Sequence, residues 1–219
     1  HANTYNIKIS NNIIRGPDSL PTDEHRYGIF TLASSAERTF KVWNNIIYDW
    51  GKFSNKQRGM SLYRNGSMHN TYIYAYNNTV YNSYIGFYTG EGNTIYLKNN
   101  IFYDCNIPVD GRVIDNSSHN LTNSSFMYFY HDEEHGGSAG DKVGQTVQFV
   151  DVQNRDFHLS STDTAAKNAG VDLSTVPNFA FLTDIDGQTR TGSWDIGADE
   201  TENNVFYSVG QNTNDHKTG

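Results

Sequence analysis

The stretch that decides the fold is residues 73–80, which read IYAYNNTV. Its first four residues alternate in character, an Asn-Asn pair follows, and the run ends on Val80. The same frame recurs as IKISNNII at 7–14, FKVWNNII at 40–47 and IYLKNNIF at 95–102. The second Asn of each pair therefore recurs after 33, 33 and 22 residues. A unit repeated along the chain with insertions of variable length is typical of a solenoid.

The alternation before each Asn pair predicts a β-strand with one face in the core. Ile73 and Ala75 occupy one parity, and Tyr74 and Tyr76 occupy the other, as do their counterparts in the other copies. Because successive side chains of a strand point to opposite faces, the apolar parity is expected inside and the Tyr parity outside. A second strand follows each Asn pair, and Gly-containing segments near residues 28, 59 and 86 mark a third. Three short strands in each repeat predict a parallel β-helix.

The Asn pairs are expected at the corners between the first and second strands. Asn tolerates the left-handed backbone of a tight corner, and stacked amides can bond to one another. The predicted ladder is formed by Asn12, Asn45, Asn78 and Asn100. The Asn pairs therefore predict the scaffold and carry no chemistry of their own.

Aromatic side chains dominate the outward columns of the predicted strands. Adjacent strands lie ~4.8 Å apart, so like residues of successive repeats should stack into flat ladders of rings. Such surfaces contact sugar rings and also form protein interfaces. The predicted carbohydrate-binding or interface residues are Trp43, Tyr48, Tyr74, Tyr76, Tyr81, Tyr96 and Tyr103. The alternative is that the stacked Tyr side chains only stabilise the sheets.

Two resemblances accompany the repeat. The repeat resembles that of secreted right-handed parallel β-helix proteins, the broad pectate-lyase-like class. Residues 145–200, which end in DIGADE, resemble the terminal region of bacterial surface β-helix proteins of the choice-of-anchor type. Together they imply an all-β, right-handed parallel β-helix of about five or six rungs over residues 1–145. A capping region over 146–200 and a polar tail over 201–219 complete the expected domain organisation. The resemblances also imply an extracellular or cell-surface location.

Composition limits the classes of partner. The chain of 219 residues fits one domain, and its net charge of −8, without a basic cluster, argues against nucleic acid. No apolar run reaches the roughly 20 residues that a membrane helix needs, so no membrane insertion is expected. The single cysteine, Cys105, excludes an internal disulfide and is expected to be a buried thiol. The start at His1, close to the first repeat, suggests a piece excised from a longer precursor.

Two sequence patterns suggest metal binding. Asp184, Asp186 and Asp195 supply carboxylates that calcium prefers, although a turn held by an Asp–Arg190 bond is the favoured interpretation. Residues 131–135, HDEEH, match a zinc-peptidase signature that requires a helix. Here the motif lies between a predicted strand and a Gly-rich loop, so a solvated loop is expected. No cofactor is predicted, with calcium kept as the possible ion.

Catalysis is the less favoured class of function. A polysaccharide lyase needs a base to remove a proton beside a uronate carboxylate. The candidate bases are Lys56, Arg58, Arg64 and His69, which lie together in one insertion. Their spacing matches no catalytic set, and the acidic net charge suits a polyuronate poorly.

Three functions therefore remain open from the sequence. The first is an extracellular or surface module that contacts polysaccharide through its aromatic columns without cleaving it. The second is a structural subunit that assembles with identical subunits, end to end, through its open first repeat near residues 5–14. The third is a polysaccharide lyase or hydrolase.

Overall fold

The computed structural model describes residues 5–18, 24–33, 38–64, 71–90, 92–111, 116–177 and 179–201 of the 219-residue chain. At the ends of three strands it describes only the backbone of Tyr5, Leu32, Ala33, Tyr63 and Arg64. The described residues form strands, turns and loops, with no α-helix among them. Accordingly, nothing in these ranges is a helix long and apolar enough to cross a membrane. All of the predicted polar tail except residue 201 lies outside them.

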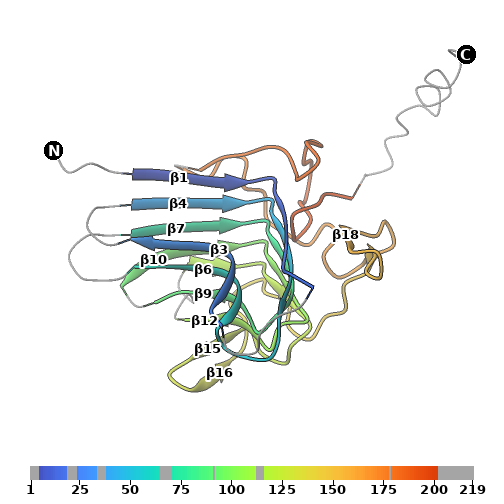
Figure 1. Ribbon diagram of the computed structural model, residues 1–219. Coiled ribbons are helices and arrows are strands. Elements are labelled where there is room, and N and C mark those ends of the chain that lie inside the picture. Colours follow the sequence, from blue (N-terminus) through green and yellow to red (C-terminus); the bar gives the residue numbers. More distant parts are fainter. Residues whose placement is uncertain are drawn as a thin grey trace, which may run out of the picture.

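Three sheets make up residues 5–135, and every strand in them is parallel except the last (Figure 1). Sheet A contains β1 (Tyr5–Ser10), β4 (Arg38–Trp43), β7 (Thr71–Tyr76), β10 (Asn93–Lys98) and β13 (Ser117–Ser118). Sheet B contains β2 (Ile13–Arg15), β5 (Ile46–Gly51), β8 (Thr79–Ser83), β11 (Ile101–Tyr103) and β14 (Leu121–Thr122). Sheet C contains β3 (Arg26–Ala33), β6 (Gln57–Arg64), β9 (Ile85–Tyr88), β12 (Ile107–Asp110), β15 (Tyr128–Tyr130) and the antiparallel β16 (Glu133–His135).

From β1 to β15, consecutive strands belong to different sheets, so each set of three strands forms one tier. The first tier is β1, β2 and β3, and the fifth is β13, β14 and β15. The register follows the sequence repeat, because Phe40 pairs with Ile73, and Ile73 pairs with Ile95. The predicted alignment of the four Asn-Asn repeats is therefore confirmed. The fold is all-β with parallel sheets and is consistent with a β-solenoid.

The core lies between the three sheets. In the third tier, each strand contributes a side chain with no exposed surface: Ile73 from β7, Val80 from β8 and Phe87 from β9. These residues carry the apolar parity that the sequence places inside. Burying side chains of this size stabilises the fold by about 1.5–3 kcal/mol each. The stacked tiers thus form one continuous core.

The Asn ladder is confirmed and extends further than predicted. Asn78 Nδ2 donates to Asn100 Oδ1 at 3.0 Å, and the same bond joins each successive pair of the ladder. The ladder continues through Asn120, which the sequence analysis missed, because Asn120 is paired with His119 instead of a second Asn. Asn120 therefore occupies the corner of the fifth tier, between Ser118 of β13 and Leu121 of β14, which pairs with Ile101.

The two members of each pair have different roles. The first, at positions 11, 44, 77 and 99, has φ between 48° and 56° and makes the left-handed corner. The second points inward and donates both its backbone N–H and its amide to the next tier. Asn tolerates this backbone better than most residues, and its amide satisfies buried carbonyls. The pair therefore both turns the chain and joins the tiers.

The end of the stack beyond the fifth tier is closed by polar contacts. Asp141 Oδ1 accepts the last ladder bonds, from the backbone N and the Nδ2 of Asn120. Tyr128, which is fully buried, donates from its hydroxyl to Asp141 Oδ2 at 2.5 Å. Lys142 forms a parallel bridge with Leu121 of β14. A carboxylate ends the ladder well, because it only accepts hydrogen bonds and leaves no amide N–H unpaired.

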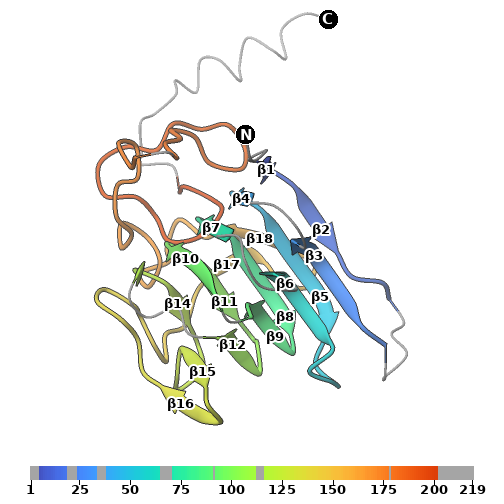
Figure 2. The ribbon, with the colours of Figure 1, turned by 90° about the vertical axis from the view of Figure 1, so that its left-hand side faces the viewer.

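Residues 146–201 lie along the side of the stack, whereas the sequence predicted a cap over its last repeat (Figures 1 and 2). They include the antiparallel hairpin of β17 (Phe149–Asp151) and β18 (Asp156–Leu159). Asn11, Asn44 and Asn77 donate side-chain hydrogen bonds to backbone carbonyls of this segment. The corner between sheets A and B thereby holds the segment over several tiers. We call residues 146–201 the side cover.

Candidate functional site

The outward aromatic column of sheet A is buried by the side cover. Tyr76 has no exposed surface, and its ring stacks on Phe179 with centroids 5.2 Å apart. Trp43 meets the edge of the same Phe179 ring at 4.9 Å, and Tyr74 stacks on Tyr96 at 4.7 Å. The prediction that this column is an open surface is wrong. Its rings do point away from the core of the stack, but Phe179 and its neighbours shield them from water.

The outward column of sheet B is covered in the same way. Tyr48 is 7% exposed and lies 4.8 Å from Phe157 of β18, centroid to centroid. Tyr81 also contacts Phe157, and Tyr103 contacts Phe149 of β17. Here too the expected open surface is wrong. A column of rings pointing outward needs an apolar cover, and in this molecule the chain supplies that cover itself.

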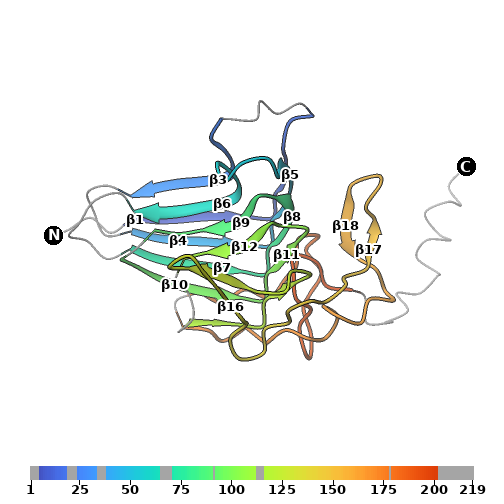
Figure 3. The ribbon, with the colours of Figure 1, turned by 90° about the horizontal axis from the view of Figure 1, so that it is seen from below.

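The outer face of sheet C carries a third aromatic row. Tyr27 and Phe30 stack with ring centroids 4.7 Å apart, and Phe30 is 45% exposed. The Arg58 guanidinium lies 3.6 Å from the ring centroid of Tyr88 and 5.9 Å from that of Tyr27. Figure 3 shows β3 and β6 on the side of the stack away from the orange and red loops of the side cover.

Arg58 is held in this row by its neighbours. Its Nε donates to the backbone oxygen of Asn55 at 3.0 Å, and one terminal nitrogen donates to Ser61. A cation–π contact such as that of Arg58 with Tyr88 stabilises the folded state by about 0.5–2 kcal/mol. Burial raises the pKa of Asp110 above its ordinary value. The positive charge of Arg58 lowers this pKa, but by less than burial raises it.

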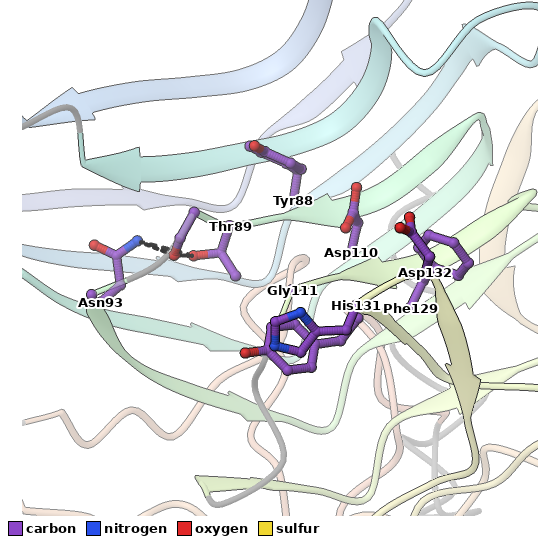
Figure 4. A pocket seen from close by; sticks show the side chains of 11 residues that line it. Tyr88, Thr89, Asn93, Asp110, Gly111, Phe129, His131 and Asp132 are labelled. Atoms are coloured by element: carbon purple, nitrogen blue, oxygen red, sulfur yellow. Dashed lines mark hydrogen bonds between the residues drawn. The ribbon is translucent and has the colours of Figure 1, made fainter.

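A pocket of about 580 Å³ opens beside Tyr88 (Figure 4). It lies where β9, β12 and β15 end and where β10 begins. Its lining residues are Tyr88, Thr89, Gly90, Gly92, Asn93, Asp110, Gly111, Phe129, Tyr130, His131 and Asp132. Aromatic rings, two carboxylates and one amide therefore share one concave surface.

The amide of Asn93 is fixed but only partly satisfied. Its Nδ2 donates to Thr89 Oγ1 at 3.1 Å and to the backbone oxygen of Gly90 at 3.0 Å. Its Oδ1 is buried and accepts no hydrogen bond from the described part of the chain. A buried acceptor without a partner is costly, and Figure 4 shows this oxygen directed away from the other labelled side chains of the pocket.

The candidate catalytic bases are not brought together by the described residues. Lys56 and Arg58 lie before and within β6, and Arg58 reaches the row on sheet C. For Arg64 the backbone alone is described, so its side chain lies outside the described residues, as does the whole of His69. Asp110 and Asn93 give no sequence signal, because both stand alone in the sequence. The register of β9 and β12 places Asp110 beside Tyr88, and Asn93 reaches the pocket from the start of β10.

Among the described residues, the three predicted calcium carboxylates do not form one close set of ligand atoms. Asp184 accepts backbone hydrogen bonds from Asp186 and Gln188, and Asp195 accepts from the backbone of Thr201. Both are buried and act as turn-forming acceptors. The side-chain carboxylate of Asp186 lies beside His158.

The predicted Asp–Arg pair is also corrected. Arg190 is buried and pairs with Glu200, with its Nη1 at 2.9 Å from Oε2. It donates further hydrogen bonds to the backbone oxygens of Gly197 and Ala198. Burial raises the pKa of Glu200 to about 7. The turn is thus held by a buried Arg–Glu pair and by carboxylates that accept from the backbone.

The segment HDEEH forms the turn and the second strand of the hairpin made by β15 and β16. His131 and Asp132 have φ of 52° and 59°, which is the pattern of a two-residue hairpin turn. His135 lies on β16, which pairs antiparallel with β15. The helix that a zinc-peptidase motif requires is therefore absent at these residues, as the sequence context predicted.

Comparisons with known proteins give no relative. No family model matches the chain, and neither the curated proteins nor the solved structures contain a significant match. Function is therefore inferred from the geometry of the sheet C face and its pocket.

Proposed function

We propose that the chain is a right-handed parallel β-helix module of an extracellular or surface protein that binds a neutral polysaccharide without cleaving it. The parallel sheets and the buried Asn ladder support the fold. The handedness follows the general rule that crossover connections between parallel strands of one sheet are right-handed. The observation that carries the function is the pocket at the ends of β9, β12 and β15, where the rings of Tyr88 and Phe129 lie with the carboxylates of Asp110 and Asp132.

The chemistry of this pocket suits a sugar. Pyranose rings bury their C–H faces on aromatic rings, and their hydroxyl groups bond to amide and carboxylate oxygens. Tyr88 and Phe129 supply rings, while Asp110 and Asp132 supply acceptors. A neutral sugar is favoured because two carboxylates in the pocket and a net charge of −8 repel uronates.

The proposed contact surface replaces the columns that the side cover buries. The row from Phe30 through Tyr27 and Arg58 to Tyr88 continues the pocket across sheet C. Several sugar units of an extended chain can lie across such a row. The polysaccharide hypothesis thus moves from sheets A and B to sheet C.

The test is binding of neutral oligosaccharides on a glycan array, followed by calorimetry on the best ligand. We expect Tyr88→Ala and Asp110→Ala each to weaken binding about tenfold or more, which is about 1.4 kcal/mol. Phe53→Ala is the matched control, because Phe53 is an aromatic residue 72% exposed outside the pocket lining. Absence of any glycan ligand, or equal binding by all three variants, contradicts the proposal. Release of reducing ends by the wild type contradicts its non-catalytic part.

The first tier favours a second function, pairing of identical subunits. β1, β2 and β3 are all edge strands, and Ile13 is 60% exposed. Unpaired strand edges are templates for pairing with another chain. Because Asp141 and Lys142 close the opposite end, we propose pairing of two first tiers in a dimer, in place of an end-to-end filament.

Sedimentation velocity at rising protein concentration tests this pairing. A dimer is expected for the wild type and a monomer for Ile13→Lys, which places a charge at the edge. Val150→Lys is the control, because Val150 is similarly exposed at 56% but lies in the hairpin β17–β18. A wild-type monomer at high concentration, or equal dimers of both variants, contradicts the proposal.

A further inference from the structure

A histidine and two carboxylates converge where the side cover folds against itself. His158 lies on β18, Asp186 lies in the turn after Asp184, and Asp199 lies near the end of the described chain. One ligand atom from each falls within 4.8 Å of the other two. Within the described ranges, this is the one set of three such side chains that meets this spacing.

The orientation of the histidine is fixed by a fourth side chain. Asp156 Oδ1 lies 2.5 Å from His158 Nδ1, and a carboxylate accepts, so Nδ1 carries the hydrogen. The lone pair of a neutral ring is then on Nε2, which lies 3.2 Å from Asp186 Oδ2. A carboxylate that holds the far nitrogen is the usual support of a metal-binding histidine.

The two carboxylates of the cluster differ in their surroundings. Asp199 is 6% exposed, and its Oδ2 accepts from the backbone N of Leu159 at 2.8 Å, which fixes its position. Asp186 is half exposed, so its side chain can adjust to an ion. One rigid and one mobile carboxylate thus flank the ring nitrogen.

His158 Nε2 is itself a buried atom without a hydrogen-bond partner. The Asp186 oxygen is close to it but is not placed to accept a hydrogen bond from it. Ligands about 2.0–2.2 Å from a zinc ion at tetrahedral or octahedral angles lie roughly 3.0–3.5 Å apart, which matches the 3.2 Å separation. The separation is therefore compatible with two ligands of one ion.

We propose that His158, Asp186 and Asp199 bind one divalent transition-metal ion of the zinc type. One imidazole and two carboxylates suit zinc, cobalt and manganese better than calcium, which prefers six to eight oxygens. The ion joins hairpin β17–β18 to residues 184–199, two parts of the side cover. Its role is to hold the hairpin over Tyr48 and Tyr81 of sheet B.

The test uses the full chain after treatment with a chelator and dialysis. Addition of Co²⁺ is expected to give visible ligand-field absorption that saturates at one ion per chain, and Zn²⁺ is expected to remove it. Zn²⁺ is also expected to raise the melting temperature, because an ion that binds only the folded state stabilises it.

Three variants assign the site. His158→Gln and Asp186→Asn should each lose both the cobalt signal and the rise in melting temperature, and both should stay folded because neither side chain is fully buried. His135→Gln is the matched control and should keep both effects, because His135 lies on β16, outside the side cover. Asp199 is left unchanged because it also holds Leu159. Absence of a one-to-one cobalt signal in the wild type, or an unchanged signal in His158→Gln and Asp186→Asn, overturns the proposal.

Discussion

Sheets A and C carry outward aromatic rows of similar chemistry but with different environments. On sheet A, Tyr76 is fully buried against Phe179 of the side cover. On sheet C, Phe30 remains 45% exposed, and Tyr88 lines an open pocket. The comparison teaches that an outward aromatic column does not by itself identify a binding surface. What decides is whether a distant segment of the same chain buries it.

The corners of the stack differ in the same way. Asn11, Asn44, Asn77 and Asn99 form the corner between sheets A and B, where the side cover accepts their hydrogen bonds. Asp49, Asn82 and Asp104 form a left-handed corner after the sheet B strands. There Asn82 Nδ2 bonds to Asp49 Oδ1 of the preceding tier instead. The corner between sheets A and B thus bonds to the side cover in four tiers, whereas at the other corner Arg155 of the side cover pairs with Asp49 and Asn82 joins neighbouring tiers.

The largest expected difference is between Tyr76→Ala and Tyr88→Ala. Removing the fully buried Tyr76 ring leaves a cavity beside Phe179, so we expect a loss of about 3–5 kcal/mol in the free energy of unfolding. Tyr88 is half-buried and lines an open pocket, so its removal leaves less of a cavity and a loss within about 1 kcal/mol is expected. Urea unfolding of both variants measures the difference. Equal losses contradict the assignment of covered and open faces.

Alkaline unfolding gives a second, smaller test of the covered face. Burial raises the pKa of Tyr76 above its ordinary value of 10.0, so the folded state keeps the proton that the unfolded state releases. The resulting stabilisation is present below pH 10 and is lost as the pH rises toward the folded pKa, by at most about 1.4 kcal/mol per pH unit. Tyr76→Phe should flatten this decline in urea unfolding between about pH 10 and 12. A decline as steep as that of the wild type contradicts a buried hydroxyl.

The scaffold could be predicted from the sequence because its information is periodic. The apolar columns and the ladder from Asn12 to Asn100 repeat at intervals that match the register of the strands. The ladder members Asn120 and Asp141 were missed because neither follows another Asn. Their hydrogen bonds come from position at the next corner, which a motif alone does not show.

The candidate sites were harder to predict for a different physical reason. The side cover has no period, and its contacts join residues such as Tyr76 and Phe179 that lie far apart in sequence. The available signal was the series of large apolar residues between 149 and 194, which must bury their rings somewhere. Asp110 reaches the pocket through the register of β12 with β9, and Asn93 reaches it from the start of β10, so residue type gave no indication of the pocket.

The smallest expected effect compares Asn77→Ala with Asn82→Ala. The two residues have left-handed φ of 48° and 55°, so the backbone cost of introducing Ala is shared. Asn77 Nδ2 also donates at 3.0 Å to the backbone oxygens of both Asp195 and Gly197 in the side cover. Loss of these buried bonds should make Asn77→Ala less stable than Asn82→Ala by about 1–2 kcal/mol.

Urea unfolding with two probes separates this effect from a general loss of stability. Fluorescence of Trp194, which is buried in the side cover, should change before far-ultraviolet circular dichroism of the sheets in Asn77→Ala. In Asn82→Ala the two transitions should coincide, because Asn82 bonds within the stack. Trp43 and Trp50 are replaced by Phe in both proteins so that the fluorescence reports on Trp194 alone. Coincident transitions in Asn77→Ala, with no deficit against Asn82→Ala, would mean that the corner between sheets A and B does not attach the side cover to the stack.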